Sequence, residues 1–312
     1  MTPASELSPP DIVVRRTAAA TPPGPVVGAA QDLAQLVRDL RRSRELLYQL
    51  TRRDITIRYK QAVMGFGWAL FMPLMIVFSG VVVQLALANF AGRPVSGAGI
   101  GGMAVKAVPW AFFVGAIGFA TNSLVQNISL VTKVAFPRAV LPLSAVGAQL
   151  FDSSIAMVAL AVLLPLLGGV VASPALLWVP LLLMLLITFT VACALFLSCA
   201  NLFFRDVKYI VQVLLTFGIF FTPVFFEPAM FGARGAAIAM LNPMSPILEG
   251  LRLSVTKGHN LLEPLVTTLA NGTPVTVWSP WYLVYALGVA IIGLPAAALL
   301  FQRMQYAFAE YI

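Results

Sequence analysis

Charged residues are scarce in this sequence: Asp, Glu, Lys and Arg make up 10% of its 312 residues, against about a quarter in ordinary soluble domains. Histidine occurs once, at His259, which excludes a His-based metal cluster and argues against a His-dependent catalytic triad. None of the five lysines completes the G-x-x-x-x-G-K-[ST] pattern of an ATP-binding loop. The chain therefore has no recognisable cofactor site of its own, and ATP-driven work would need a partner.

Apolar residues, by contrast, make up 60% of the chain and give a mean hydropathy of +0.91. The run from Trp68 to Phe90 contains no charged residue, and roughly 20 apolar helical residues cross a hydrocarbon core of about 30 Å. The sequence therefore predicts a membrane protein. Cys193 and Cys199 lie in one apolar run on different helix faces, so we interpret them as small buried residues and not as a disulfide.

Six apolar runs are predicted to cross the membrane. They are residues 67–90, 108–128, 142–168, 175–200, 209–227 and 281–301. The predicted fold class is an all-α integral membrane protein whose six transmembrane helices occupy residues 67–305. No internal repeat is present, so any two-fold symmetry requires a second copy of the chain.

The basic residues favour one orientation of these spans. With a cytoplasmic N-terminus, 15 of the 20 Lys and Arg residues lie inside, and five lie outside (Arg93, Lys106, Arg234, Arg252 and Lys257). The positive-inside rule therefore predicts that both termini are cytoplasmic, and the start of the sequence lacks the features of a cleaved secretory signal. We interpret the net charge of +8 as this topological signal and not as nucleic-acid binding.

The segments outside the spans differ in composition. Residues 1–28 are rich in Pro, Ala, Thr and Gly and are predicted to be a flexible tail. Residues 29–66 are basic, with apolar residues at helical spacing, and are predicted to form a cytoplasmic amphipathic segment at the membrane surface. Residues 306–312 are predicted to be a cytoplasmic tail.

Prolines divide residues 228–280 into apolar pieces too short to span a membrane. Short re-entrant helices at the outer leaflet, between the fifth and sixth spans, are predicted here. Ser245-Pro246 has the composition of a helix start, and Glu249 and Arg252 would lie one turn apart as an ion pair.

Asp152 lies several residues inside the third apolar run, where an ionised carboxylate costs roughly 2.5–3.5 kcal/mol on insertion scales. It should therefore face protein or water. It either lines a polar path or braces helices by bonding Ser153, Ser154 or a neighbouring helix, and the sequence leaves both open. No second acid lies nearby in sequence, which argues against a proton relay.

Two further patterns have alternative interpretations. The string Gly97, Gly99 and Gly102 matches a dinucleotide-binding fingerprint, but no strand–turn–helix unit surrounds it, so we predict a flexible loop. Aromatic rings in the first and fifth runs either pack against lipid or line a path along which the apolar faces of sugars slide. The path candidates are Trp68, Phe71, Asp152, Phe217, Phe220, Phe221 and Phe225.

Four sequence motifs resemble one family. The string from Leu46 to Gln61 (LLYQLTRRDITIRYKQ), continued to Pro73, is similar to the opening of the permease subunit of ABC polysaccharide exporters, the Wzm-like group that exports O-antigen, teichoic acid, capsule and galactan. Three further motifs agree in order and spacing, and the resemblance covers residues 45–305. They are Phe136-Pro137-Arg138 with Leu141-Pro142, Asn201 to Lys208, and Leu241-Asn242-Pro243-Met244 leading to Glu249-Gly250-Leu251-Arg252.

The resemblance implies a homodimer of six-span subunits in the bacterial cytoplasmic (inner) membrane. Two copies of a cytoplasmic ATPase subunit would bind ATP and Mg, and the assembly would move a lipid-linked polysaccharide to the outer leaflet. This chain would be the channel-forming subunit, surrounded by membrane lipids, and not an enzyme.

The resemblance also implies roles for particular segments. Residues 45–60 correspond to an interface helix against the ATPase, residues 129–140 to a coupling helix, and the first and fifth spans border the channel. The implied ATPase-interface residues are Leu47, Leu50, Arg52, Arg53, Asp54, Arg58, Lys133, Phe136, Pro137 and Arg138. The outer re-entrant residues are Asn242, Pro243, Glu249 and Arg252.

Other functions predict different features. A small-lipid or multidrug exporter of the same superfamily predicts a cleft open to lipid in place of a continuous wide path. A membrane-embedded glycosyltransferase or lipid phosphatase predicts acids, His or Arg clustered at one membrane face, which the sequence does not offer. A scaffold protein would need neither Asp152 within a span nor the broken stretch at 228–280.

Overall fold

The structure is a computed structural model that describes residues 27–60, 65, 67–91, 97–133, 136–166, 169–268, 272 and 274–305. The predicted tail of residues 1–28 lies outside the described residues except for its last two. The predicted tail of residues 306–312 lies outside them entirely.

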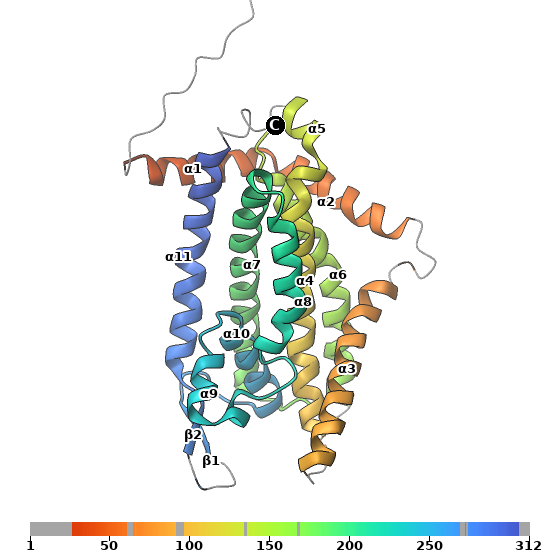
Figure 1. Ribbon diagram of the computed structural model, residues 1–312, viewed down its shortest axis with the longest axis vertical. Coiled ribbons are helices and arrows are strands. Elements are labelled where there is room, and N and C mark those ends of the chain that lie inside the picture. The colour runs from red at the N-terminus through yellow and green to blue at the C-terminus, as the bar shows by residue number, and fades with distance from the viewer. Residues whose placement is uncertain are drawn as a thin grey trace, which may run out of the picture.

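Long helices run side by side along the long axis of the molecule (Figure 1). They are α3 (Gly67–Ala91), α4 (Gly97–Gln126), α6 (Val140–Leu166), α7 (Trp178–Phe203), α8 (Val207–Phe221) and α11 (Pro280–Met304). Each predicted span overlaps one of these helices.

Among the described residues, four segments are long and apolar enough to cross a membrane. They are Gly99–Gln126, Val140–Pro165, Pro174–Phe203, which includes the 3₁₀ turn η1 (Pro174–Leu177), and Pro280–Met304. Shorter apolar segments are α8 and Leu74–Val83 within α3. The chain is thus a multi-pass membrane protein, whereas a complete crossing by α3 and α8 stays a prediction.

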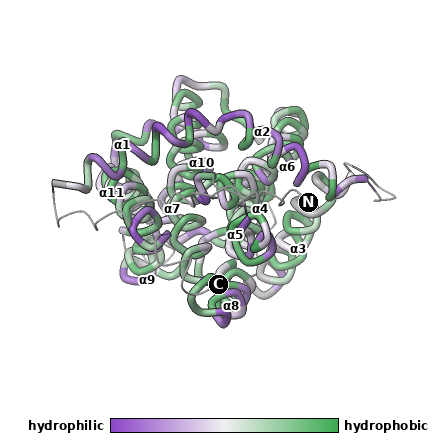
Figure 2. The backbone as a smooth tube through the Cα atoms, turned by 90° about the horizontal axis from the view of Figure 1, so that it is seen from above, coloured by the Kyte–Doolittle hydropathy of each residue, from purple (hydrophilic) through white to green (hydrophobic). Residues whose placement is uncertain are grey.

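Two helices, α1 (Val27–Arg42) and α2 (Arg44–Tyr59), lie across one end of the bundle, called here the α1–α2 end. The predicted amphipathic segment is therefore two helices joined at Ser43. Leu36 of α1 and Leu50 of α2 are buried in an apolar cluster with Leu124, Val140 and Phe301. Seen from above, their hydrophilic stretches cross a mainly hydrophobic bundle (Figure 2). The short helix α5 (Ile128–Lys133) projects from the same end.

The opposite end holds the broken stretch that follows α8 (Figure 1). Its short helices are η2 (Pro228–Phe231), α9 (Gly232–Ala239), α10 (Met244–Arg252) and the π-helical turn η3 (Leu253–Lys257). Strands β1 (Leu265–Thr268) and β2 (Pro274–Trp278) form an antiparallel hairpin in which Val266 pairs with Thr276. We call this the hairpin end; the sequence interpretation had no strand here.

The helix α4 lies at the centre of the bundle against α6 and α7 (Figure 2), where the small buried residues Ala116 and Ala120 let helices approach closely. The prediction of a flexible loop at Gly97, Gly99 and Gly102 is wrong, because all three belong to α4. At Gly102 a Cβ atom would lie 3.1 Å from Cδ of Arg252, so this glycine allows a close approach to α10.

Candidate functional site

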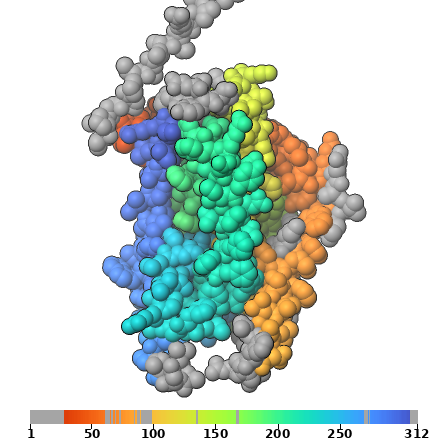
Figure 3. Space-filling model, in the orientation of Figure 1, coloured from red at the N-terminus to blue at the C-terminus, as the bar shows by residue number. Residues whose placement is uncertain are grey.

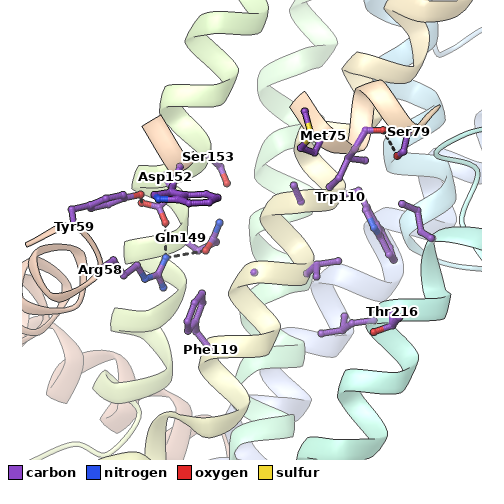
Figure 4. A pocket seen from close by; sticks show the side chains of 17 residues that line it. Arg58, Tyr59, Met75, Ser79, Trp110, Phe119, Gln149, Asp152, Ser153 and Thr216 are labelled. Atoms are coloured by element: carbon purple, nitrogen blue, oxygen red, sulfur yellow. Dashed lines mark hydrogen bonds and ion pairs between the residues drawn. The ribbon is translucent and has the colours of Figure 1, made fainter. Parts of the chain in front are cut away.

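A cavity of about 630 Å³ opens between the end of α2 and helices α3, α4, α6 and α8. Its wall combines aromatic rings with polar side chains (Figure 4). The aromatic residues are Trp68, Trp110 and Phe119, and the polar ones are Arg58, Tyr59, Ser79, Gln149, Asp152, Ser153 and Thr216. Apolar rings beside hydrogen-bonding groups suit a polar ligand that has apolar faces.

Asp152 sits in this wall and connects α6 to α2 (Figure 4). Its side chain accepts a hydrogen bond from Nη1 of Arg58 at 2.5 Å and one from the hydroxyl of Tyr59 at 2.6 Å. Asp152 is 7% exposed. The carboxylate therefore braces a neighbouring helix, which is α2, and it also lines the cavity, whereas its role in a polar path stays a prediction.

The other contacts of Arg58 and Tyr59 strengthen this connection. Arg58 donates to Oε1 of Gln149 at 3.0 Å, and its guanidinium lies 3.8 Å from the ring centre of Phe119 on α4, within the range of a cation–π interaction. Burial and the hydrogen bond to Asp152 raise the pKa of Tyr59 above its usual range. The phenol therefore stays protonated and keeps donating to the carboxylate.

Most of the other predicted interface residues on α2 make contacts within this chain. Arg53 pairs with Asp54 at 2.9 Å and donates to Asn127 at 3.2 Å, and the Ser144 hydroxyl donates to Asp54 at 3.1 Å. Leu47 and Leu50 pack into the apolar cluster beneath α1 and α2, whereas Arg52 is exposed. The contact of these residues with an ATPase stays a prediction.

In the predicted coupling segment, residues 129–140, the structure describes all but residues 134–135; residues 129–133 belong to α5, and Val140 begins α6. Lys133 is exposed, while Phe136 packs against the apolar cluster at the α1–α2 end, and Pro137 is half-buried. Arg138 donates to the carbonyl oxygen of Gln305, just past α11, at 2.5 Å. Residues 136–138 are therefore attached to the bundle, and α5, which precedes them in the chain, projects from it.

The predicted path aromatics fall into two groups. Trp68 and Phe71 of α3 lie edge to face at 5.4 Å, and Trp68 lines the cavity. On α8, Phe217, Phe220 and Phe221 are exposed, with Phe220 63% accessible. This helix face is open along one side of the molecule (Figure 3). Beyond α8, Phe225 lies partly buried against the main core and Gly80 of α3.

A cluster of charged side chains is buried towards the hairpin end. The predicted ion pair between Glu249 and Arg252 is confirmed, as both residues are buried and their side chains are bonded in α10. Arg252 also pairs with Glu227 at 3.0 Å, and Nζ of Lys106 lies 3.8 Å from Glu249. Asn242, next to Pro243, donates to the Thr222 hydroxyl at 2.9 Å.

Several residues of the cavity and of the buried charged cluster were not predicted from the sequence. In the cavity they are Tyr59, Trp110, Phe119 and Gln149. Gln149 precedes Asp152 by three residues in an apolar run, so the pair marked a polar helix face that could have been found. Lys106 was assigned to an outer connector, but it is 1% exposed inside α4.

A comparison with protein families matches residues 45–255 to the family described as ABC-2 type transporter. The match extends over more than half of the chain, from the first turn of α2 to the turn after α10. The chain belongs to the ABC-2 transporter membrane family. The cavity and its connection to α2 therefore belong to the membrane component of an ABC transporter, and family membership implies an ABC ATPase partner.

Curated relatives extend the match over most of the chain. The O-antigen export system permease protein RfbA of Myxococcus xanthus is 28% identical over 286 residues, which cover 90% of this chain and 100% of that protein. A protein of the same name from Klebsiella pneumoniae is 25% identical over 280 residues, which cover 86% of this chain and 95% of that protein. The resemblance predicted from the four motifs is confirmed.

Proposed function

We propose that this ABC-2 permease is the channel-forming subunit of an ATP-driven exporter that moves a lipid-linked polysaccharide across the bacterial cytoplasmic membrane. The observation that carries the proposal is the cavity of about 630 Å³, which combines aromatic rings with polar groups and is connected to α2. Similarity to O-antigen export permeases over 90% and 86% of the chain supports the same substrate class.

The chemistry of the cavity fits sugar rings. The apolar C–H faces of a sugar can lie on Trp68, Trp110 or Phe119, while its hydroxyl groups exchange hydrogen bonds with side chains such as Gln149 and Thr216. Because the charge of Asp152 is paired with Arg58, a moving glycan meets no isolated charge that would hold it. The wall therefore favours weak, repeated contacts.

The exposed surfaces suggest how the exporter assembles. The open aromatic face of α8 supports a homodimer in which α3 and α8 of two copies border the glycan path. The exposed residue Arg52 on α2 and the projecting helix α5 offer a docking surface for one ATPase subunit on each copy, which would bind ATP and Mg. In this proposal the chain has six spans and both of its termini are cytoplasmic, as the distribution of basic residues favours, so this surface faces the ATP side.

The connection from α2 into the bundle supplies a mechanism. When ATP closes the two ATPase subunits, each moves the α2 helix to which it is docked. The pull on Arg58 and Tyr59 is transmitted to Asp152 of α6, and the contact of Arg58 with Phe119 transmits it to α4. The free energy comes from a higher affinity of the ATP-bound partner for the open arrangement of the spans.

Reconstitution tests this proposal. Vesicles that hold the chain together with its ATPase subunit should export a lipid-linked glycan when ATP is supplied, and vesicles with either component alone should not. Glycan movement that needs neither ATP nor a second protein would contradict the proposal. Transport of short amphiphiles but not of glycans would instead indicate the small-lipid or multidrug exporter of the same superfamily.

A further inference from the structure

The helix α8 is loosely packed along its length. A cavity of about 480 Å³ lies between α8 and α4, and one of about 600 Å³ lies among α4, α7 and α8. The cavity of about 630 Å³ described above also borders α8. Because cavities leave a helix with few packing contacts, the position of α8 depends strongly on how its two ends are attached.

The ends of α8 are attached by polar contacts. At the α1–α2 end, the backbone N–H of Lys208 donates to Oδ1 of Asn201 at 3.1 Å. At the hairpin end, Thr222 accepts a hydrogen bond from Asn242 and Val224 is buried in the main core, and the residues that follow make two adjacent polar contacts with the bundle. Nζ of Lys106 donates to the carbonyl oxygen of Phe226 at 2.8 Å, and Arg252 pairs with Glu227 at 3.0 Å.

The two contacts at the hairpin end belong to one charge cluster. Lys106, Glu249 and Arg252 are 1%, 0% and 3% exposed, so two cations and one carboxylate are buried together. Their net charge is one positive unit, which is costly in a low-dielectric site unless a counter-charge is near. Glu227 supplies that counter-charge and makes the cluster neutral.

Glu227 differs from the other three members because its side chain is 46% exposed. Its carboxylate can be solvated by water when it leaves Arg252, whereas Glu249 has no access to water. Detachment leaves the other three residues with one uncompensated positive charge, which favours the bound state, but the carboxylate of Glu227 itself regains water. Among the four residues, Glu227 is therefore the member that can detach. It is also the member that lies on the segment continuing from α8.

We propose that Lys106, Glu249 and Arg252 form a fixed buried receptor that holds the outer end of α8 in place through Glu227, and that release of Glu227 allows α8 to move and the path to open. This latch rests on the proposed function, because it assigns a gate to the same path. Glu227 acts here as a positioning residue and does not contact the substrate.

The variant Glu227→Gln tests the latch, because it keeps the shape of the side chain and removes the charge. The wild-type chain and the variant are each reconstituted with the ATPase subunit in vesicles that contain a trapped small dye, without ATP. Since a hydrogen bond between charged groups contributes about one to two powers of ten to an equilibrium, dye leakage should rise on the order of tenfold in the variant. The matched control is Glu263→Gln, an exposed acid at the same end of the molecule but outside the cluster.

Salt dependence provides a second readout. A half-exposed ion pair is screened by salt, so leakage through the wild-type complex should rise between low and high ionic strength. Leakage through Glu227→Gln should change little, because it has no charge left to screen. A side chain that served only for packing would produce no such difference.

The outcomes separate the latch from the function on which it rests. If the wild-type complex exports glycan with ATP but Glu227→Gln leaks no more than wild type, or no more than Glu263→Gln, the latch is overturned and the function stands. If the wild-type complex exports no glycan at all, the proposed function fails. Raised leakage confined to Glu227→Gln, together with salt sensitivity confined to the chains that keep Glu227, supports the latch.

Discussion

The substitution Asp152→Asn tests the contact through which α2 is proposed to act on the bundle. The carboxylate accepts from Arg58 at 2.5 Å and from Tyr59 at 2.6 Å, and the side chains of the Arg58–Asp152 pair are 18% and 10% exposed. An Asn side chain has one acceptor oxygen and one donor NH₂ group. One of the two donors therefore loses its acceptor at residue 152, and the charge of Arg58 loses the carboxylate as its counter-ion.

The expected loss of unfolding free energy in Asp152→Asn follows from these contacts. A hydrogen bond to a charged group contributes about 1.5–3 kcal/mol, and removing one partner of a fully buried ion pair costs about 3–5 kcal/mol. Because the pair keeps some contact with solvent and Asn retains one acceptor, we expect the free energy of unfolding to fall by about 2–3 kcal/mol. Export should fall more than ATP hydrolysis does, since the ATPase site lies in the partner.

Equilibrium unfolding in mild detergent measures the stability, and the reconstituted complex measures export and ATP hydrolysis. The matched control is Ser154→Ala, because within the described part of the chain the Ser154 hydroxyl donates inside its own helix, to the carbonyl oxygen of Phe151. A double-mutant cycle with Arg58→Gln then isolates the pair. The reasoning is refuted if Asp152→Asn costs no more than the control, or if the two single costs simply add in the double variant.

Three further substitutions test other parts of the account. Arg52→Glu combined with Arg53→Glu should lower the affinity for the ATPase subunit at least tenfold without preventing membrane insertion, as measured by co-purification; wild-type export by this variant would remove α2 from the interface. Gly147→Leu should displace α2, because a Cβ atom at residue 147 would lie 3.2 Å from the hydroxyl oxygen of Thr51 on that helix. Export should therefore drop, while the amount of protein inserted in the membrane stays constant. Phe220→Ser should slow glycan flux severalfold with an unfolding free energy within about 0.5 kcal/mol of wild type; equal slowing by Ile292→Ser, on an exposed face of α11, would contradict a path on α8.

The positions of the long helices could be predicted from the sequence because each depends on a contiguous property, the length of an apolar run. The pair of Glu249 and Arg252 could be predicted for the same reason, as its members lie one helical turn apart. The hairpin was also signalled, by alternating Val and Thr residues on both sides of Gly272, which has a φ of +79°. It was missed because these strands are short and lie among prolines.

Contacts between distant segments could not be predicted in this way. The need of Asp152 for a partner followed from its position in an apolar run, but Arg58 lies 94 residues away, and the spacing of one sequence does not reveal that pairing. Lys106 was placed in an outer connector because a charge normally ends a span. Its partners, Phe226 and Glu249, come from segments more than 100 residues later, and they make burial of the ammonium group possible.

The most direct test of the central claim places a photoreactive phenylalanine analogue at Phe119, in the wall of the cavity next to Arg58. In a complex engaged in ATP-driven export, illumination should attach the glycan to this position and not to the same analogue at Ile292, on the exposed face of α11. Labelling at Ile292 with none at Phe119 would show that the polysaccharide does not pass through this cavity.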